Sequence, residues 1–378
     1  MTDPSPGPKG LYVHLPFCAS RCAYCTFVVS TERRLVGAYV EAIHRELELL
    51  DLPEGTPLET VYLGGGTPSL IGGGELAGLL RAILERHPGV PGIEVTTEAN
   101  PEDLTPELLG LWTAAGINRI SIGVQSFVDG ELTAIGRRHD AARARAACHL
   151  LARVPSVTWN LDLILGIPGQ TPESLEVSLA GALEAAPHHI SVYILEMDKP
   201  HRLQELYRRH PDEFPGDDTV AGLYLRVHEV LGKAGYEHYE ISNFALPGAE
   251  ARHNLRYWDR RPVHALGVGA HGNDGNRRWA NLESLAGYLE AIRGGERPLA
   301  WETTLSPREM LAEGLMLGLR LAAGVDRGSA DAGGASFPEF GRMLEGFLQR
   351  DLAVEDAGRI FLTPEGWLLS NELFATLV

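Results

Sequence analysis

Six short apolar runs alternate with longer segments of helical pattern through the first half of the chain. The runs are rich in valine, isoleucine and leucine, as parallel strands covered on both faces are, and they span residues 11–15, 60–64, 93–98, 119–124, 157–165 and 190–195. This alternation predicts repeated strand–helix–strand units and a parallel sheet. Six units are fewer than the eight of a closed barrel. The pattern therefore favours an α/β fold of the partial (β/α)6, TIM-like barrel type, with a doubly wound open sheet as the alternative.

The regular alternation ends near residue 196. Residues 197–218 are polar, charged and proline-bearing, which is typical of an inserted excursion. Near the end of the chain, the order helix, short strand, turn, short strand, helix predicts a small winged-helix-like unit. We therefore divide the sequence into a partial-barrel core over 1–235, a connecting region over 236–305 and a C-terminal winged-helix-like α+β unit over 306–378.

Composition and charge restrict the class of protein and its partners. The chain has 378 residues, of which 44% are hydrophobic and 22% are charged, as in an ordinary globular protein. The formal net charge of -17 argues against nucleic acid as a partner. No apolar run reaches the ~18 residues of a membrane span. Residues 1–10 lack the apolar segment of a signal peptide, so we expect a cytoplasmic protein.

Three of the four cysteines lie in one short loop after the first predicted strand. Cys18, Cys22 and Cys25 have the spacing C-x3-C-x2-C, whereas Cys148 lies alone in a helical pattern and is expected to be a small buried residue. So few cysteines, gathered in one loop, argue against a disulfide framework and for metal or redox chemistry.

The cysteine loop allows three kinds of site. A zinc ion needs a fourth ligand, for which His14 is a candidate. Cys22 and Cys25 have the spacing of a redox pair. An iron–sulfur cluster held by three cysteines keeps one iron open, which allows that iron to bind a substrate or a second cofactor.

The motifs around these cysteines resemble those of a known superfamily. C-x3-C-x2-C with an aromatic residue before the last cysteine is the signature of radical S-adenosylmethionine (SAM) proteins. The stretches YVHLPFCASRCAYCTF, YLGGGTPS, EANPEDLT, GVQSF and IGRRHD resemble the oxygen-independent coproporphyrinogen III oxidase-like branch over nearly the whole chain. The resemblance implies a [4Fe–4S] cluster on the three cysteines, SAM on its open iron, an electron donor, and cleavage of SAM to methionine and a 5′-deoxyadenosyl radical.

The same resemblance implies which residues contact SAM. They are expected at the carboxyl ends of the predicted strands, where ligands gather in parallel α/β folds. Several of these residues have an alternative interpretation: a tight turn for the glycines, a solvated strand end for Glu98, a surface charge for Arg137 and core packing for the two tyrosines. The residues are Tyr12, Tyr24, Gly65, Gly66, Thr67, Glu98, Gln125, Arg137 and Asp162.

Three features separate the chain from the oxidases of this branch. Phe27 stands where those enzymes have a further cysteine, and only 17 residues precede Cys18 where they have a longer segment. Residues 253–258, HNLRYW, match the H-N-x-x-Y-W motif of HemW-type heme chaperones. The match implies that heme binds His253, Asn254, Tyr257 and Trp258; a turn and core packing are the alternative interpretation of these residues.

These observations predict a heme chaperone with a radical SAM core. Such a protein binds heme, a [4Fe–4S] cluster and SAM, and it passes heme to acceptor proteins such as respiratory hemoproteins at the membrane. The alternatives are an oxygen-independent coproporphyrinogen III oxidase, which uses the radical to decarboxylate propionates, and a radical SAM enzyme with another substrate. Whether the protein is an enzyme stays open at this point.

Overall fold

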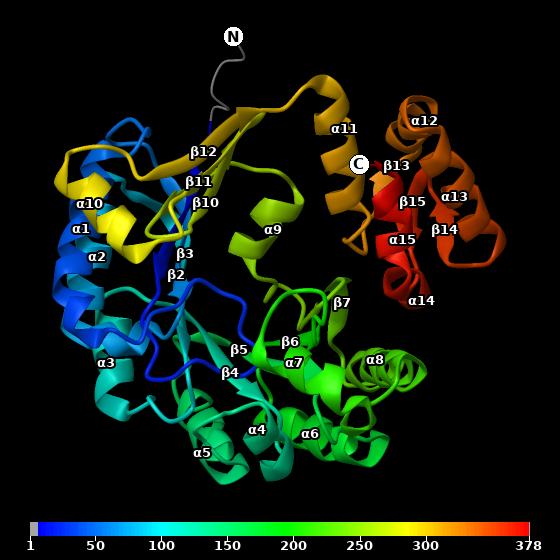
Figure 1. Ribbon diagram of the computed structural model, residues 1–378, viewed down its shortest axis with the longest axis horizontal. Coiled ribbons are helices and arrows are strands. Elements are labelled where there is room, and N and C mark those ends of the chain that lie inside the picture. Colours follow the sequence, from blue (N-terminus) through cyan, green and yellow to red (C-terminus); the bar gives the residue numbers. More distant parts are fainter. Residues whose placement is uncertain (1–6, 378) are drawn as a thin grey trace.

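Six parallel strands, each hydrogen-bonded to the next in chain order, form the centre of the molecule (Figure 1). The computed structural model describes residues 7–377. The strands are β1 (Lys9–Leu15), β2 (Leu58–Gly65), β3 (Gly89–Ala99), β4 (Arg119–Gln125), β5 (Thr158–Leu165) and β6 (His189–Ile194). The predicted partial (β/α)6 barrel is therefore confirmed.

Helices cover the outer face of these strands. They are α1 (Val36–Leu49), α2 (Gly73–Arg86), α3 (Pro106–Ala114), α4 (Asp129–Ala134), α5 (Ala141–Leu151), α6 (Pro172–Ala185) and α8 (Asp217–Lys233). Local signals start several of them: α6 has proline in its first turn and a capping box between Thr171 and Ser174. Their apolar stripes bury residues such as Ile43 and Cys148 in one core, so the prediction of a buried Cys148 is confirmed.

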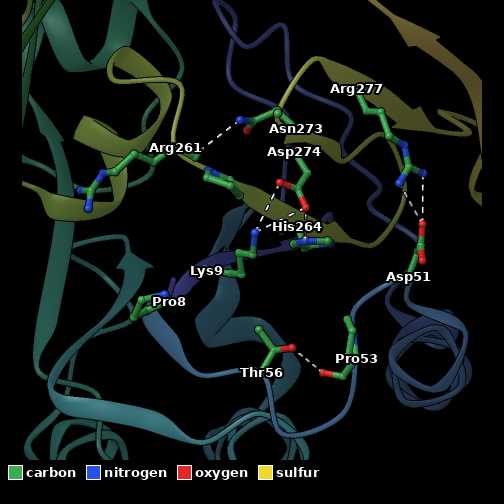
Figure 2. Close-up of polar contacts among 12 residues, drawn as sticks. Pro8, Lys9, Asp51, Pro53, Thr56, Arg261, His264, Asn273, Asp274 and Arg277 are labelled. Atoms are coloured by element: carbon green, nitrogen blue, oxygen red, sulfur yellow. Dashed lines mark hydrogen bonds and ion pairs between the residues drawn. The ribbon is translucent and has the colours of Figure 1, made fainter. Parts of the chain in front are cut away.

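The region over 236–305 adds strands to both edges of the sheet. β7 (Glu237–Glu240) and β8 (Asn243–Ala245) extend the β6 edge; β9 (Val263–Leu266), β10 (His271–Asp274), β11 (Arg277–Asn281) and β12 (Leu299–Thr304) extend the β1 edge. Two helices accompany them, α9 (Arg252–Trp258) and α10 (Leu285–Arg293). Figure 2 shows Lys9 of β1 and His264 of β9 directed toward Asp274, with Lys9 Nζ 3.4 Å from the Asp274 carboxylate. This ion pair ties the start of β1 to β10.

The C-terminal unit lies to one side of the barrel and has its own core (Figure 1). It contains a small sheet of β13 (Val325–Asp326), β15 (Arg359–Leu362) and β14 (Ala353–Asp356), packed on α11 (Pro307–Gly318), α12 (Arg327–Ser336), α13 (Pro338–Gln349), α14 (Pro364–Leu368) and α15 (Ser370–Phe374). This arrangement confirms the α+β prediction. Ile241 N–H donates to Arg320 O at 2.9 Å, which joins the unit to the barrel edge.

The polar excursion contains a helix that the sequence pattern did not predict. Helix α7 (Arg202–Arg209) is short and mostly charged; its apolar residues Leu203, Leu206 and Tyr207 have helical spacing, but only Leu203 is buried. Leu203 N–H donates to Ala23 O at 3.2 Å, which places α7 directly against the cysteine loop.

Between residues 7 and 377, no helix is long and apolar enough to cross a bilayer. The first six residues, on which part of the expectation about a targeting segment rests, lie outside the described residues.

Candidate cofactor site at the carboxyl end of the barrel

Two-residue alternation along the strands separates an apolar outer face from a polar interior. Val61 and Leu63 of β2 belong to the core beneath the helices. Between them Tyr62 points inward, where its hydroxyl donates to Glu98 Oε1 of β3 at 2.7 Å. The barrel interior is thus lined by groups able to hold a polar ligand.

The three cysteines of the loop after β1 are free thiols and are half-buried. Two of them receive hydrogen bonds from the surrounding elements: Thr67 Oγ1 donates to Cys18 Sγ at 3.6 Å, and an Arg137 guanidinium N–H donates to Cys22 Sγ at 3.5 Å. Burial raises the pKa of the Cys18 thiol to about 11 and also raises that of Cys25. The loop therefore presents thiols from which a bound metal must displace the protons.

A single metal ion does not fit this loop as it stands. In the part of the chain that the structure describes, no three His, Cys, Asp or Glu side chains converge in a way that could hold a metal ion. His14, the candidate fourth zinc ligand, has both ring nitrogens engaged, by Val28 O at 2.7 Å and by the Tyr12 hydroxyl at 2.8 Å. Thiolates of a cluster bind different irons, so three cysteines need not converge on one point to hold it.

A glycine turn at the end of β2 lies beside the cysteine loop. Gly66 N–H donates to Leu15 O at 2.9 Å and Thr67 N–H donates to Phe17 O at 2.8 Å, which ties the turn to the end of β1. Gly65 has a φ of +112°, and a Cβ there would collide with the His14 ring. Only glycine is unstrained at this position.

Two interior carboxyls, on β3 and on β5, lie near each other at this end of the barrel. Glu98 accepts from Gly65 N–H at 2.8 Å as well as from Tyr62, and Asp162 of β5 accepts from Asn160 Nδ2 at 2.6 Å. Burial raises the pKa of Glu98 to about 7 and that of Asp162 to about 6, against the opposing effect of these donors. Both groups are therefore able to change protonation when a charged ligand enters.

Arg137 connects the rim, meaning the carboxyl ends of the barrel strands, to the cysteine loop. Its guanidinium donates to Asn100 Oδ1 at 2.6 Å and to Gly123 O at 2.7 Å, and it lies 3.4 Å from the Tyr24 hydroxyl. Sequence reasoning did not single out Asn100, although this residue joins Arg137 to Thr67 by donating to the Thr67 hydroxyl at 3.1 Å. The EANPEDLT motif that contains Asn100 was the available signal.

Gln125 supplies the observation that favours a missing ligand. It has a φ of +72°, and its buried side-chain oxygen has no hydrogen-bond partner among the described residues. A Cβ on Gly123 would lie 2.9 Å from the Gln125 amide nitrogen and 3.4 Å from Arg137, so the two side chains meet at the rim. A strained backbone and an unpartnered buried amide are features of a ligand site.

The structure thus gathers most of the predicted SAM residues at one end of the barrel. One connected group surrounds the cysteines and consists of the glycine turn, Glu98, Gln125, Arg137 and Tyr24. Asp162 lies on β5, next to the strand that ends in Gln125. Tyr12 lies deeper, with its ring centroid 6.0 Å from that of Tyr62.

Helix α9, which carries the predicted heme residues, is anchored inside the barrel. Glu94 of β3 accepts from the first two backbone N–H groups of α9, at 3.1 Å for Arg252 and 2.8 Å for His253. A carboxylate at this end of a helix is favourable because it satisfies free N–H groups and the helix dipole. His253 is 2% exposed, and burial lowers its pKa to about 3. Its Nδ1 lies 2.8 Å from Thr60 Oγ1, whereas its Nε2 lies 3.4 Å from the Tyr257 hydroxyl.

The four motif residues of α9 lie in two pairs, each four positions apart, on two neighbouring faces of the helix. His253 and Tyr257 face the barrel interior, where the His253 ring lies 5.2 Å from that of Tyr62. Asn254 and Trp258 occupy the adjoining face, and Trp258 meets Arg320 of the C-terminal unit. Tyr62 therefore touches both the heme motif, through its ring, and Glu98, through its hydroxyl.

Comparisons with known proteins agree with this architecture. The Radical SAM superfamily model matches residues 12–180, and the HemN C-terminal domain model matches residues 305–369. Proteins named heme chaperone HemW are similar along their whole length: that of Mycobacterium tuberculosis is 38% identical over 99% of this chain and 96% of its own, and that of Bacillus subtilis is 33% identical over 98% and 99%. The solved structure of Escherichia coli coproporphyrinogen III oxidase (HemN) covers 98% of this chain and 90% of its own with a TM-score of 0.83 at 21% identity, which shows a shared fold.

Proposed function

Because the chain belongs to the HemW family within the radical SAM superfamily, we propose that it is a heme chaperone that passes heme to acceptor proteins. In this proposal the protein binds a [4Fe–4S] cluster and SAM in addition to heme. The similarity to proteins of that name extends over nearly the entire chain, including the C-terminal unit.

The rim at the carboxyl end of the barrel supports the cluster and SAM. Cys18, Cys22 and Cys25 would hold the cluster, and Thr67 and Arg137 already direct hydrogen bonds at two of their sulfurs. When bound, the cluster and SAM would supply one-electron chemistry at this site. The protein's own part is to present the glycine turn, the unpartnered Gln125 oxygen and the buried carboxyls to a charged ligand, and to keep water away.

The placement of His253 is the observation that carries the heme proposal. Burial keeps its imidazole neutral, as an iron ligand must be. Thr60 lies at hydrogen-bond distance from Nδ1, which fixes the ring orientation and leaves Nε2, with its longer 3.4 Å contact to Tyr257, as the nitrogen that iron would take. Histidines that bind metal commonly have their second nitrogen held in this way.

Coproporphyrinogen III oxidation is the second candidate function, favoured by the fold shared with the E. coli oxidase. Phe27, at the position where the oxidases resembling this chain have a further cysteine, is 63% exposed beside the cysteine loop. This difference weighs toward the chaperone.

A paired experiment separates the two functions. Anaerobically reconstituted protein is titrated with hemin and followed by the Soret band, and in parallel it is incubated with SAM, reductant and coproporphyrinogen III. We expect hemin binding that His253→Ala weakens and that His271→Ala, an exposed control on β10, leaves unchanged. Formation of protoporphyrinogen would overturn the chaperone proposal, and hemin binding that is insensitive to His253→Ala would overturn the role of the motif.

The remaining parts of the proposal concern partners and location. We place the protein in the cytoplasm, with an electron donor for the cluster and with heme acceptors that include proteins at the membrane. Transfer of heme from the loaded protein to an apo-hemoprotein, followed as a change in the Soret spectrum, tests the acceptor step. Heme that stays on the protein in the presence of excess acceptor would contradict it.

A further inference from the structure

An arginine with no ion-pair partner among residues 7–377 lies against the tryptophan of the heme motif. The Arg320 guanidinium carbon is 5.6 Å from the Trp258 ring centroid and 5.3 Å from that of Phe374 in α15. Arg320 follows α11 and so belongs to the C-terminal unit, whereas Trp258 ends α9. The contact therefore joins the connecting region to the C-terminal unit.

Several polar atoms in this region are buried without partners among residues 7–377. They include two N–H donors, Trp258 Nε1 and Arg320 Nε, and the side-chain oxygens Glu240 Oε1 and Asn243 Oδ1. Glu240 and Arg320 act on each other electrostatically, yet they form no ion pair within 4.0 Å. Buried polar atoms are normally satisfied, so these two donors and two acceptors beside a cation indicate a missing polar partner.

The charges around Arg320 and Trp258 indicate which kind of acceptor would bind there. Arginine stays protonated at every physiological pH, and its planar fork suits a carboxylate. Glu240 is fully buried, and burial raises its pKa to about 7. Its carboxyl can therefore hold a proton when a second carboxylate approaches, which removes the repulsion between two anions.

We propose that Arg320 and Trp258 bind a propionate carboxylate of the tetrapyrrole. This inference rests on the proposed function, because it assigns a second anchor to the same ligand. In this arrangement His253, on one face of α9, would contact the iron at the centre of the macrocycle. Trp258, on the adjoining face, and Arg320 would contact the propionate edge. The subsite requires the C-terminal unit, so bound heme links that unit to the barrel.

Esterified heme tests the subsite without changing the protein. Hemin and hemin dimethyl ester have the same macrocycle and iron, but the ester lacks the charged carboxylates. Charge-assisted hydrogen bonds of this kind correspond to roughly a 10- to 100-fold preference of the wild-type protein for hemin. Soret titrations of full-length protein with both compounds measure this ratio.

Variants assign the preference to Arg320. Arg320→Gln should bind hemin as weakly as the ester, Arg320→Lys should retain part of the preference, and Arg342→Gln, an exposed control in α13, should match the wild type. A wild type without preference, a preference that survives Arg320→Gln, or an equal loss for both compounds would overturn the subsite. Absence of any hemin binding by the wild type would instead overturn the proposed function.

Discussion

Glu46 is a buried carboxyl whose ionisation should destabilise the fold. It lies on the inner face of α1 and accepts hydrogen bonds from Gly267 N–H at 2.7 Å, Tyr288 hydroxyl at 2.6 Å and Asn281 Nδ2 at 2.5 Å. Burial outweighs these donors and raises its pKa from 4.5 to about 7. The three partners come from the loop after β9, from β11 and from α10, so Glu46 holds the region beyond β1 against α1.

The sign and size of the effect follow from this pKa. Between about pH 4.5 and 7 the folded state retains a proton that the unfolded chain has released, so the free energy of unfolding falls as the pH rises. The stabilising contribution of Glu46 is complete below its pKa in the unfolded chain and is lost as the pH rises through its pKa in the folded state. A pKa raised from 4.5 to about 7 corresponds to a loss of roughly 3 kcal/mol by pH 8.

Glu46→Gln removes the titration while keeping the side-chain shape. Urea unfolding of both proteins, followed by tryptophan fluorescence at pH 4.5 and pH 8, gives the difference in the free energy of unfolding at each pH. We expect the variant to gain roughly 3 kcal/mol relative to wild type between these conditions. Other titrating groups cancel in the comparison.

Glu48→Gln, an exposed position on the same helix, is the matched control and should show no such pH dependence. A difference between Glu46→Gln and wild type that is constant with pH would refute the reasoning, because Glu46 would then ionise as it does in the unfolded chain. A difference that moves in the opposite direction would show that the three donors outweigh burial.

Three further predictions concern the cofactor and heme sites. Cys22→Ala should lose the broad visible absorption of a reconstituted cluster, whereas Cys148→Ala, buried in α5, should keep it. Gly65→Ala should weaken SAM binding in equilibrium dialysis by about tenfold or more, since a positive φ costs roughly 1–2 kcal/mol and the new Cβ collides with an imidazole. Gly74→Ala, with open space around it in α2, should bind SAM normally. Thr60→Val should weaken hemin binding roughly 10-fold in Soret titrations, because the motif histidine loses the partner of its Nδ1.

Each prediction has an outcome that contradicts it. A Cys22→Ala protein that keeps its iron and absorption would show that the loop is not the cluster site. Normal SAM binding by Gly65→Ala would mean that the ligand does not approach this backbone. Unchanged hemin affinity in Thr60→Val would show that the hydrogen-bond partner of His253 Nδ1 does not contribute to heme binding.

Local patterning predicted most of the elements correctly. Runs of β-branched and apolar residues marked β1 to β6 to within a few residues, because the face of each strand beneath the helices is packed with such residues. Helix α7 was missed because it is short and lies in a segment dominated by charged and polar residues. The spacing of the cysteines and the HNLRYW stretch were visible because each motif lies within a few residues of chain.

Contacts between distant segments were not predictable in this way. Asn100 joins Thr67 to Arg137, Tyr62 touches both His253 and Glu98, and Arg320 meets Trp258 only after the C-terminal unit has packed on the barrel. Burial and the pKa of a carboxyl likewise depend on neighbours from several strands. Residue type and local spacing therefore specify which chemistry the chain can carry, while the packing of the barrel specifies which groups meet, because side-chain interactions act only over a few ångströms.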